Sequence, residues 1–136
     1  MIDEAEKVLV KREVKPTSIR LVVLAYLLRY SKAQSLRDVE LGLPETDRSS
    51  IFRSLKVFEE KNVIHSIEDG SGRVKYAVCA EGCSCDLLDL HYHFYCTNCD
   101  LTYCLLNNPI PIINLPKNYI MKQANAVVKG LCDKCC

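Results

Sequence analysis

Residues 35–58 read SLRDVELGLPETDRSSIFRSLKVF and contain the start and stop signals of two helices. Ser35 followed by Asp38 resembles a capping box, in which the two side chains accept hydrogen bonds from each other's backbone. This pair predicts a short helix over about 36–41, which Gly42 ends. The segment Leu-Pro-Glu-Thr that follows is typical of a turn.

The second helix of the pair is longer and amphipathic. Thr46 or Asp47 can cap its first turn, and the pattern carries the helix to about Lys61. Helical spacing turns three apolar side chains toward a core, namely Ile51, Leu55 and Phe58. Two helices joined by a short glycine-containing turn predict a helix-turn-helix.

The flanking segments extend this unit. Upstream, a helix that starts near Thr17 is predicted from the apolar stripe Ile19, Val22, Val23, Tyr26, Leu27 and Tyr30. Downstream, Val63–Ile67 and Val74–Cys79 read as two strands around the turn signal Asp69-Gly70-Ser71-Gly72. Alternation places Val63, His65 and Ile67 on one face of the first strand, and Lys75, Ala77 and Cys79 on one face of the second. Helices followed by such a hairpin predict a winged helix.

All nine cysteines lie at or after Cys79, and four of them form two pairs of C-x2-C spacing. These pairs are Cys96/Cys99 and Cys132/Cys135. Zinc prefers four ligands in a tetrahedron, and each C-x2-C turn points two thiolates at one centre. Four thiolates close the site, which predicts a structural zinc ion. Redox dithiols and buried metal-free cysteines are the alternatives, but neither pair follows a strand and opens a helix as a thioredoxin-like site would.

The rest of the second half contains few further signals. Residues 80–90 mix glycine, cysteine and acidic residues, which predicts a linker between a unit at 1–79 and a unit at 91–136. Three strands are expected in the second unit and would bring the two cysteine pairs together: Tyr92–Tyr95, Leu101–Leu106 and Ala124–Leu131. Pro109, Pro111 and Pro116 leave room for no more than a short helix between the last two.

The exposed face of the 47–61 helix is suited to DNA. With the apolar stripe inside, the side chains left outward or flanking are Arg48, Ser49, Phe52, Arg53 and Lys56. Arginine pairs bidentately with guanine, serine reaches phosphates, and an aromatic edge touches the thymine methyl group. The alternative is a solvated face with Phe52 half buried, because helix-turn-helix patterns also occur in proteins that bind no DNA.

The chain has three histidines, His65, His91 and His93. Strand alternation sends His91 and His93 to the same side, which suits chelation of one ion, while His65 lies in the hairpin beside Cys79. A shared His/Cys metal site is one interpretation. Ordinary surface or hydrogen-bonded histidines are the other.

Together, a winged helix, the motif H-x-H-x2-C-x2-C at 91–99 and a terminal G-x-C-x2-C resemble the ferric uptake regulator family of bacterial transcriptional regulators. The resemblance covers about residues 15–136. It includes Thr17-x2-Arg20 and Ser50-Ile51-Phe52-Arg53, where the family typically has Thr-Val-Tyr-Arg. It implies an α+β homodimer with an N-terminal winged helix-turn-helix DNA-binding domain and a small C-terminal α/β dimerisation domain. It also implies a four-cysteine zinc site and a regulatory metal between the domains.

The resemblance assigns roles to particular residues. DNA contacts are expected from Lys15, Arg20, Ser49, Ser50, Phe52 and Arg53. The segments Val63-Ile64-His65 and Tyr76-Ala77-Val78-Cys79 look like the zinc uptake regulator branch, which implies a sensed zinc ion on His65, Cys79, His91 and His93. Ala33, Gln34, Ala77 and Cys104 depart from the iron-type ligand pattern. Cys83 and Cys85 compete with Cys79 as a ligand, and Cys136 receives no role.

The leading hypothesis is therefore a cytoplasmic, zinc-dependent repressor of metal uptake genes that binds operator DNA and is not an enzyme. Alternatives are an iron-responsive regulator, a thiol- or peroxide-responsive regulator that uses Cys79, Cys83, Cys85 or Cys104, and a zinc-ribbon redox or interaction protein without DNA binding. The cytosolic expectation comes from two segments. The longest apolar run, Leu21–Leu28, is far short of the ~20 residues of a membrane span, and Met1–Lys15 is charged.

Overall fold

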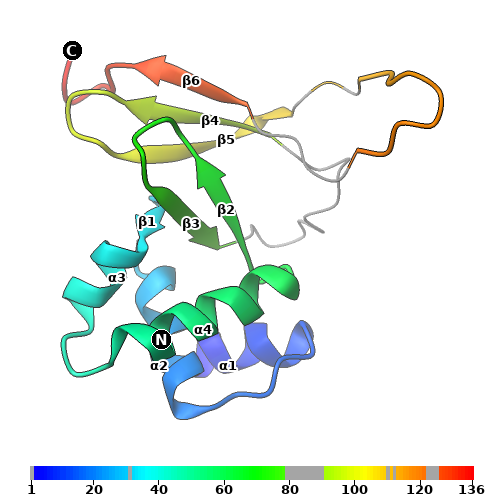
Figure 1. The fold of residues 1–136 in the computed structure, drawn as a ribbon. Coiled ribbons are helices and arrows are strands. Elements are labelled where there is room, and N and C mark those ends of the chain that lie inside the picture. The colour runs from blue at the N-terminus through cyan, green and yellow to red at the C-terminus, as the bar shows by residue number, and fades with distance from the viewer. Residues whose placement is uncertain (1, 31, 79–90, 110, 112, 122–125) are drawn as a thin grey trace.

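The computed structural model describes residues 2–30, 32–78, 91–109, 111, 113–121 and 126–136. Within these ranges the chain begins with helices and ends with strands (Figure 1). The helices are α1 (Ile2–Lys11), α2 (Ser18–Leu28), α3 (Leu36–Gly42) and α4 (Arg48–Glu60). One sheet has the order β1-β3-β2, with β1 (Gln34–Ser35), β2 (Ile64–Glu68) and β3 (Val74–Val78). The other has the order β5-β4-β6, with β4 (His91–Cys96), β5 (Thr102–Pro109) and β6 (Val127–Gly130).

The predicted helix-turn-helix is confirmed as α3 and α4. Ser35 and Asp38 form the reciprocal capping box at α3, with N–O distances of 3.1 and 3.0 Å. Asp47 caps α4 by accepting the backbone N–H of Ser50 at 3.0 Å. The predicted inner face of α4 is also correct, since Ile51, Leu55 and Phe58 have no exposed surface. Local signals were sufficient here because caps and periodic apolar spacing act within a few residues.

The inner face predicted for α2 is partly wrong. Thr17 caps the helix as expected, and Val23, Tyr26 and Leu27 are buried. However, Ile19, Val22 and Tyr30 are 38%, 38% and 45% exposed, whereas Leu24 and Ala25 are buried. Residues 21–28 are all apolar, so the sequence contains no polar face to orient the helix. Contacts with α1 and α4 decide which side faces the core.

The structure adds α1, a helix outside the predicted elements. Its Ala5 and Leu9 are fully buried in the core formed with α2 and α4, and they lie four residues apart on one face. Charged residues surround this narrow apolar stripe in the sequence, so the helix was not predicted. No helix of the described residues is both long and apolar enough to cross a membrane.

The hairpin of β2 and β3 lies between the helices and the second sheet (Figure 1). The strands are antiparallel, with His65 opposite Ala77 and Ile67 opposite Lys75. Ile64 packs into the helical core, while Ile67 packs with Ala33, Ala77 and Val127. Both faces of the hairpin are therefore covered, one by helices and one by the second sheet.

The second sheet brings distant segments together. β4 pairs antiparallel with β5 and parallel with β6, which sets Cys96 opposite Gly130. The expected strand Ala124–Leu131 is present as Val127–Gly130, and residues 122–125 lie outside the described residues. Among the described residues, those after Glu60 form strands, turns and irregular segments without a helix.

Candidate metal centre and nucleic-acid interface

The structure brings the two C-x2-C pairs together at one end of the second sheet. Cys96 ends β4 and Cys99 follows it in a turn, while Cys132 and Cys135 lie in the turn after β6. Parallel pairing of β4 and β6 makes both turns start at the same edge. The four Sγ atoms lie within 4.8 Å of one another. Within the described part of the chain, this is the cluster whose geometry suits a metal ion.

The spacing of the thiols fits a tetrahedral ion. Zn–S bonds of about 2.3 Å imply an edge between sulfurs of about 3.8 Å in a regular tetrahedron. The Sγ atoms of Cys99 and Cys132 are 3.8 Å apart. Cys96 and Cys132 are buried, whereas Cys99 and Cys135 are half-buried, so the cluster is largely shielded from solvent. Four cysteine ligands would complete the coordination of such an ion and leave no open position for chemistry.

The cluster also favours ionised sulfur at its centre. The backbone N–H groups of Cys99 and Cys132 donate to the Sγ of Cys96, each at 3.5 Å. These hydrogen bonds lower the pKa of Cys96 to about 6. The Asn98 side chain lowers the pKa of Cys135, but neighbouring thiols and burial outweigh it and raise that pKa to about 12. A bound cation would lower the pKa of all four thiols, because it stabilises the four thiolates together.

The predicted DNA-contact residues are divided between a hollow and the surface around it. A hollow of 460 Å³ between α2 and α4 is lined by Thr17, Ile19, Arg20, Ser50, Arg53, Ser54, Lys56 and Val57. Arg20, Ser50 and Arg53 were predicted contacts. The structure adds Thr17 and Lys56 to the lining of this hollow. Lys15, Ser49 and Phe52 are exposed and lie outside the hollow lining.

Internal hydrogen bonds hold the two arginines that line this hollow. Arg53 donates to the carbonyl of Ser49 and to the hydroxyl of Ser50, both at 3.3 Å. Arg20 donates to the carbonyl of Lys15 at 3.0 Å. The bonding leaves other guanidinium N–H groups available, since arginine has five. We call this surface the basic hollow, because its charged lining residues are Arg20, Arg53 and Lys56.

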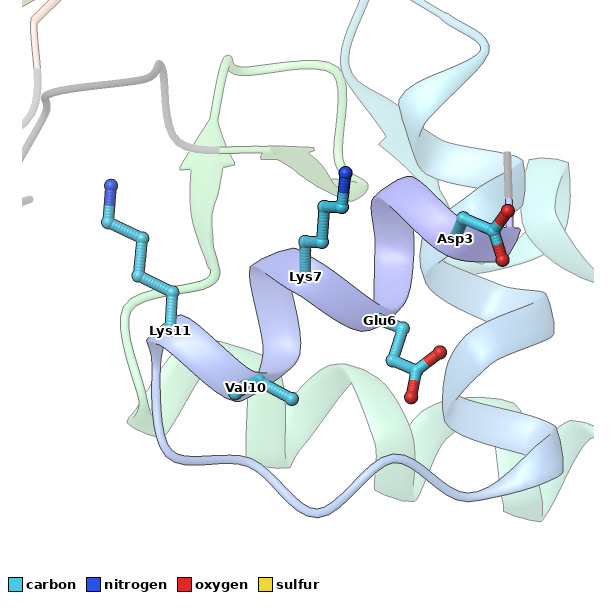
Figure 2. Close-up of a pocket in the computed structure, with 5 residues that line it drawn as sticks. All are labelled: Asp3, Glu6, Lys7, Val10 and Lys11. Atoms are coloured by element: carbon cyan, nitrogen blue, oxygen red, sulfur yellow. The ribbon is translucent and has the colours of Figure 1, made fainter.

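A second hollow, of 590 Å³ on α1, has a different character. It is lined by Asp3, Glu6, Lys7, Val10 and Lys11. Figure 2 shows Lys7 and Lys11 projecting from one side of the helix and Glu6 from another. Its two acidic and two basic side chains cancel in charge, so it lacks the positive field that attracts a polyanion.

The predicted regulatory ligands are only partly described. His65 in β2 and His93 in β4 lie together, with ring centroids 5.5 Å apart, and His93 is buried. Cys79, Cys83 and Cys85 lie outside the described residues. The backbone of His91 begins β4, and that of Cys104 lies in β5, but their side chains are outside the description. The β4–β5 register shifts between His91 and His93, so the regular alternation assumed for this pair is interrupted.

Comparisons with known proteins agree with this architecture. Among solved structures, a zinc uptake regulator in complex with zinc and DNA has a TM-score of 0.69 at 19% identity, covering 98% of this chain and 91% of that chain. The ferric uptake regulator of Helicobacter pylori, described with three functional metal-binding sites, has a TM-score of 0.62 at 17% identity, covering 98% and 90%. The ferric uptake regulator of Pseudomonas aeruginosa, solved with manganese, has a TM-score of 0.61 at 18% identity, covering 98% and 100%. At these identities the likeness shows a shared fold.

Among curated protein sequences, no match is found. The sequence profile of the ferric uptake regulator family, by contrast, matches residues 11–128. This range includes the helix-turn-helix, the hairpin and the first cysteine pair. The chain belongs to the ferric uptake regulator family.

Proposed function

We propose that this protein is a metal-responsive transcription regulator that binds double-stranded operator DNA and represses metal uptake genes. The basic hollow carries this proposal. Its charged side chains are all basic, and it lies between α2 and the second helix of a helix-turn-helix. That helix enters the major groove in proteins with this motif. Family membership and the DNA complex solved for a zinc uptake regulator of similar fold support the same partner.

The proposed contacts fall into two groups. Arg53 and Phe52 would face base edges, because bidentate arginine–guanine pairs and aromatic–thymine contacts give sequence specificity. Phosphate contacts are assigned to Lys15, Arg20, Ser49 and Ser50, which would set the position of the helix on the duplex. Lys56 joins this group on the strength of its place in the basic hollow, where its Nζ lies 5.7 Å from the Phe52 ring centroid.

The four-cysteine cluster is proposed as a structural zinc site. Thiolate ligands in a tetrahedral set favour zinc over the oxygen-rich geometries of manganese or ferrous iron. The domain division proposed is 1–79 for DNA binding, 80–90 for a linker, and 91–136 for dimerisation and metal binding. A symmetric dimer would present two copies of α4 to successive major grooves.

The sensed metal is proposed to be zinc held by His65, Cys79, His91 and His93. The contact between the rings of His65 and His93 supports this, because they come from the hairpin and from the second sheet respectively. An ion shared by them would stabilise one arrangement of the two halves, and a ligand shifts an equilibrium through such differential binding.

The test is binding of the purified chain to a randomised duplex library at low salt, with zinc and with a mild chelator. We expect enrichment of a defined operator only with zinc, and two zinc ions per chain of which the chelator removes one. Failure to retain any duplex with zinc present would reject DNA binding. Binding that responds to mild oxidant and ignores zinc would instead favour the thiol- or peroxide-responsive alternative.

A further inference from the structure

A lysine is buried where the hairpin meets the second sheet. Lys75, in β3, is 2% exposed, although lysine is almost never fully buried without partners. Its ammonium donates to the carbonyl of Asp100, to the hydroxyl of Thr102 at 3.1 Å and to the carboxylate of Asp69 at 3.0 Å. An ammonium has three N–H donors, so each one is satisfied.

The acceptors are themselves part of a closed network. Asp69 has no exposed surface, and its Oδ2 accepts a second hydrogen bond from the Thr102 hydroxyl at 2.6 Å. Its Oδ1 accepts the backbone N–H of Ser71 at 2.9 Å. The carbonyl of Thr102 accepts the backbone N–H of Ala33 at 3.1 Å. Thr102 therefore bonds to three residues of the N-terminal half (residues 2–78), two in the hairpin and one next to β1.

An outer layer continues the network toward the cysteine cluster. The ring centroid of Tyr95 lies 4.9 Å from the Lys75 Nζ, and the Tyr95 hydroxyl donates to the Asp100 carboxylate at 2.5 Å. Arg73 approaches the other oxygen of that carboxylate at 3.9 Å. Asp100 directly follows Cys99, so the network joins β3 to the first cysteine turn. Its two basic and two acidic groups balance in charge.

The hydrogen bonds of this network can fix the orientation of the hairpin on the second sheet, which apolar packing at the same junction cannot do. Beside it, Ala33, Ile67, Ala77 and Val127 pack together, and such contacts are non-directional. Hydrogen bonds to a buried ion pair, in contrast, require one geometry, and a displacement would leave charges buried without partners. A buried ion pair is weak evidence for stability, since an apolar replacement is often as stable. Its directional bonds are suited to setting orientation.

We propose that Asp69, Lys75 and Thr102 form a latch between the two halves, which holds the hairpin in one orientation on the second sheet. Lys75 and Thr102 are positioning residues. The latch depends on the proposed function in one respect, because the half that it orients is the half to which DNA binding is assigned. Because Asp100 belongs to the network, the latch also ties that orientation to the cysteine turn.

Amide exchange in the metal-loaded 136-residue chain without DNA tests the latch. The Ala33 amide is the reporter, since its hydrogen bond to Thr102 crosses between the halves. The Val63 amide is the reference, since it donates to Phe58 at 2.8 Å within the N-terminal half. In Lys75→Met and in Thr102→Val, we expect Ala33 to exchange at least about tenfold faster while Val63 is unchanged. Thr97→Val makes the same chemical change at an exposed threonine of the cysteine turn and should leave both amides as in the parent.

A neutral double variant separates orientation from simple charge burial. Lys75→Met/Asp69→Asn removes both charges, and Ala33 should still exchange faster than in the parent because the hydrogen bonds of the ammonium to Asp69, Thr102 and Asp100 are gone. Return of Ala33 to the parental rate would overturn the latch and leave only a charge pair. Unchanged exchange in both single variants, or equal acceleration of Ala33 and Val63, would also overturn it. If the chain binds no DNA, the proposed function is rejected, but the amide-exchange test of the latch remains valid.

Discussion

Cys96 is the thiol around which the candidate metal centre is arranged. It is fully buried, it ends β4, and the backbone N–H groups of Cys99 and Cys132 both point at its sulfur. By comparison, Cys136 is exposed and lies outside the cluster although it neighbours Cys135. The same side-chain chemistry therefore has two environments within one short turn, which provides a matched pair for mutation.

Replacement of Cys96 with serine is expected to abolish tight zinc binding and to unfold the second sheet. Binding of structural zinc contributes on the order of 10 kcal/mol to the folding of small zinc domains, because their unfolded chains have no preformed site. The measurement is zinc content per chain, with thermal unfolding and sedimentation. Cys136→Ser should match the parent in all three. A Cys96→Ser dimer with the parental melting temperature would refute the structural role.

Arg53 offers a residue-scale test of the DNA interface. Arg53→Ala should weaken operator binding by roughly 1 to 3 kcal/mol, the usual loss for one good base contact. Fluorescence anisotropy at fixed salt and zinc measures this. Lys61→Ala removes an exposed charge just beyond α4, outside the basic hollow, and should have little effect. Equal affinities for the parent and Arg53→Ala would mean that α4 is not the recognition helix.

At the scale of elements, the β2–β3 hairpin is the part of the fold with two different neighbours. Its turn contains Gly70 and Gly72, both in the left-handed region with φ of 86° and 89°. A side chain at Gly70 would also meet the side chain of Lys129 in β6. Glycine is permissive at positive φ, which lets the turn close tightly against the second sheet. This geometry brings Asp69 inward, where it meets Thr102.

The pKa of Asp69 predicts how the hairpin responds to acid. Burial by itself raises that pKa, but hydrogen bonds from Ser71 and Thr102 outweigh it and hold the pKa at about 2. The unfolded value is about 3.9. Because the folded pKa is the lower one, the carboxylate contributes its full stabilisation above about pH 4 and loses it as pH falls through about 2.

The expected result is a gap in unfolding free energy between the parent and Asp69→Asn that is widest near neutral pH and narrows between about pH 4 and 2. Urea unfolding at a series of pH values measures the gap. Zinc loss in acid affects both proteins, so the difference isolates Asp69. Asp3→Asn, at an exposed position on α1, should follow the parent throughout. A gap that stays constant would contradict the assigned pKa.

At the scale of the whole molecule, polar, aromatic and apolar contacts between described residues join the halves. The polar network around Lys75 sets their orientation through its directional hydrogen bonds, and the His65–His93 pair lies at the same junction. The register of β2 on β3 explains why the lysine network and the histidine pair both occur at this junction. His65 lies opposite Ala77 and Ile67 opposite Lys75, so one face of the hairpin carries the histidine and the lysine toward the second sheet.

His93→Ala is expected to retain the fold, the dimer and the four-cysteine zinc while losing the zinc-dependent gain in DNA affinity. Couplings of this kind are commonly about five- to 150-fold. His65→Ala and Cys79→Ser should behave alike, whereas Cys83→Ser and Cys85→Ser should keep the response. The measurement pairs zinc stoichiometry with operator titrations in zinc and in chelator. Loss of the second zinc in Cys85→Ser but not in Cys79→Ser would move the fourth ligand into the linker.

The sequence by itself determined the elements whose signals are local. The helix caps at Ser35 and Asp47 depend on residues within one helical turn, and the apolar stripe of α4 depends on residues within a few turns. The hairpin turn depends on a motif of four residues. The cysteine spacing likewise predicted the cluster, because a C-x2-C turn is a local geometry that thiolate chemistry makes specific.

Only the tertiary structure decided which surfaces meet. The inner face of α2, the burial of Lys75 and the parallel pairing of β4 with β6 all depend on partners far away in the chain. A lysine in an alternating strand reads as solvent-facing. It is buried here because Asp69 and Thr102 supply its hydrogen bonds, and Thr102 comes from a different sheet. Burial of a charge is favourable only with such hydrogen-bonding partners. The residues next to Lys75 in the sequence do not indicate that these partners will be present.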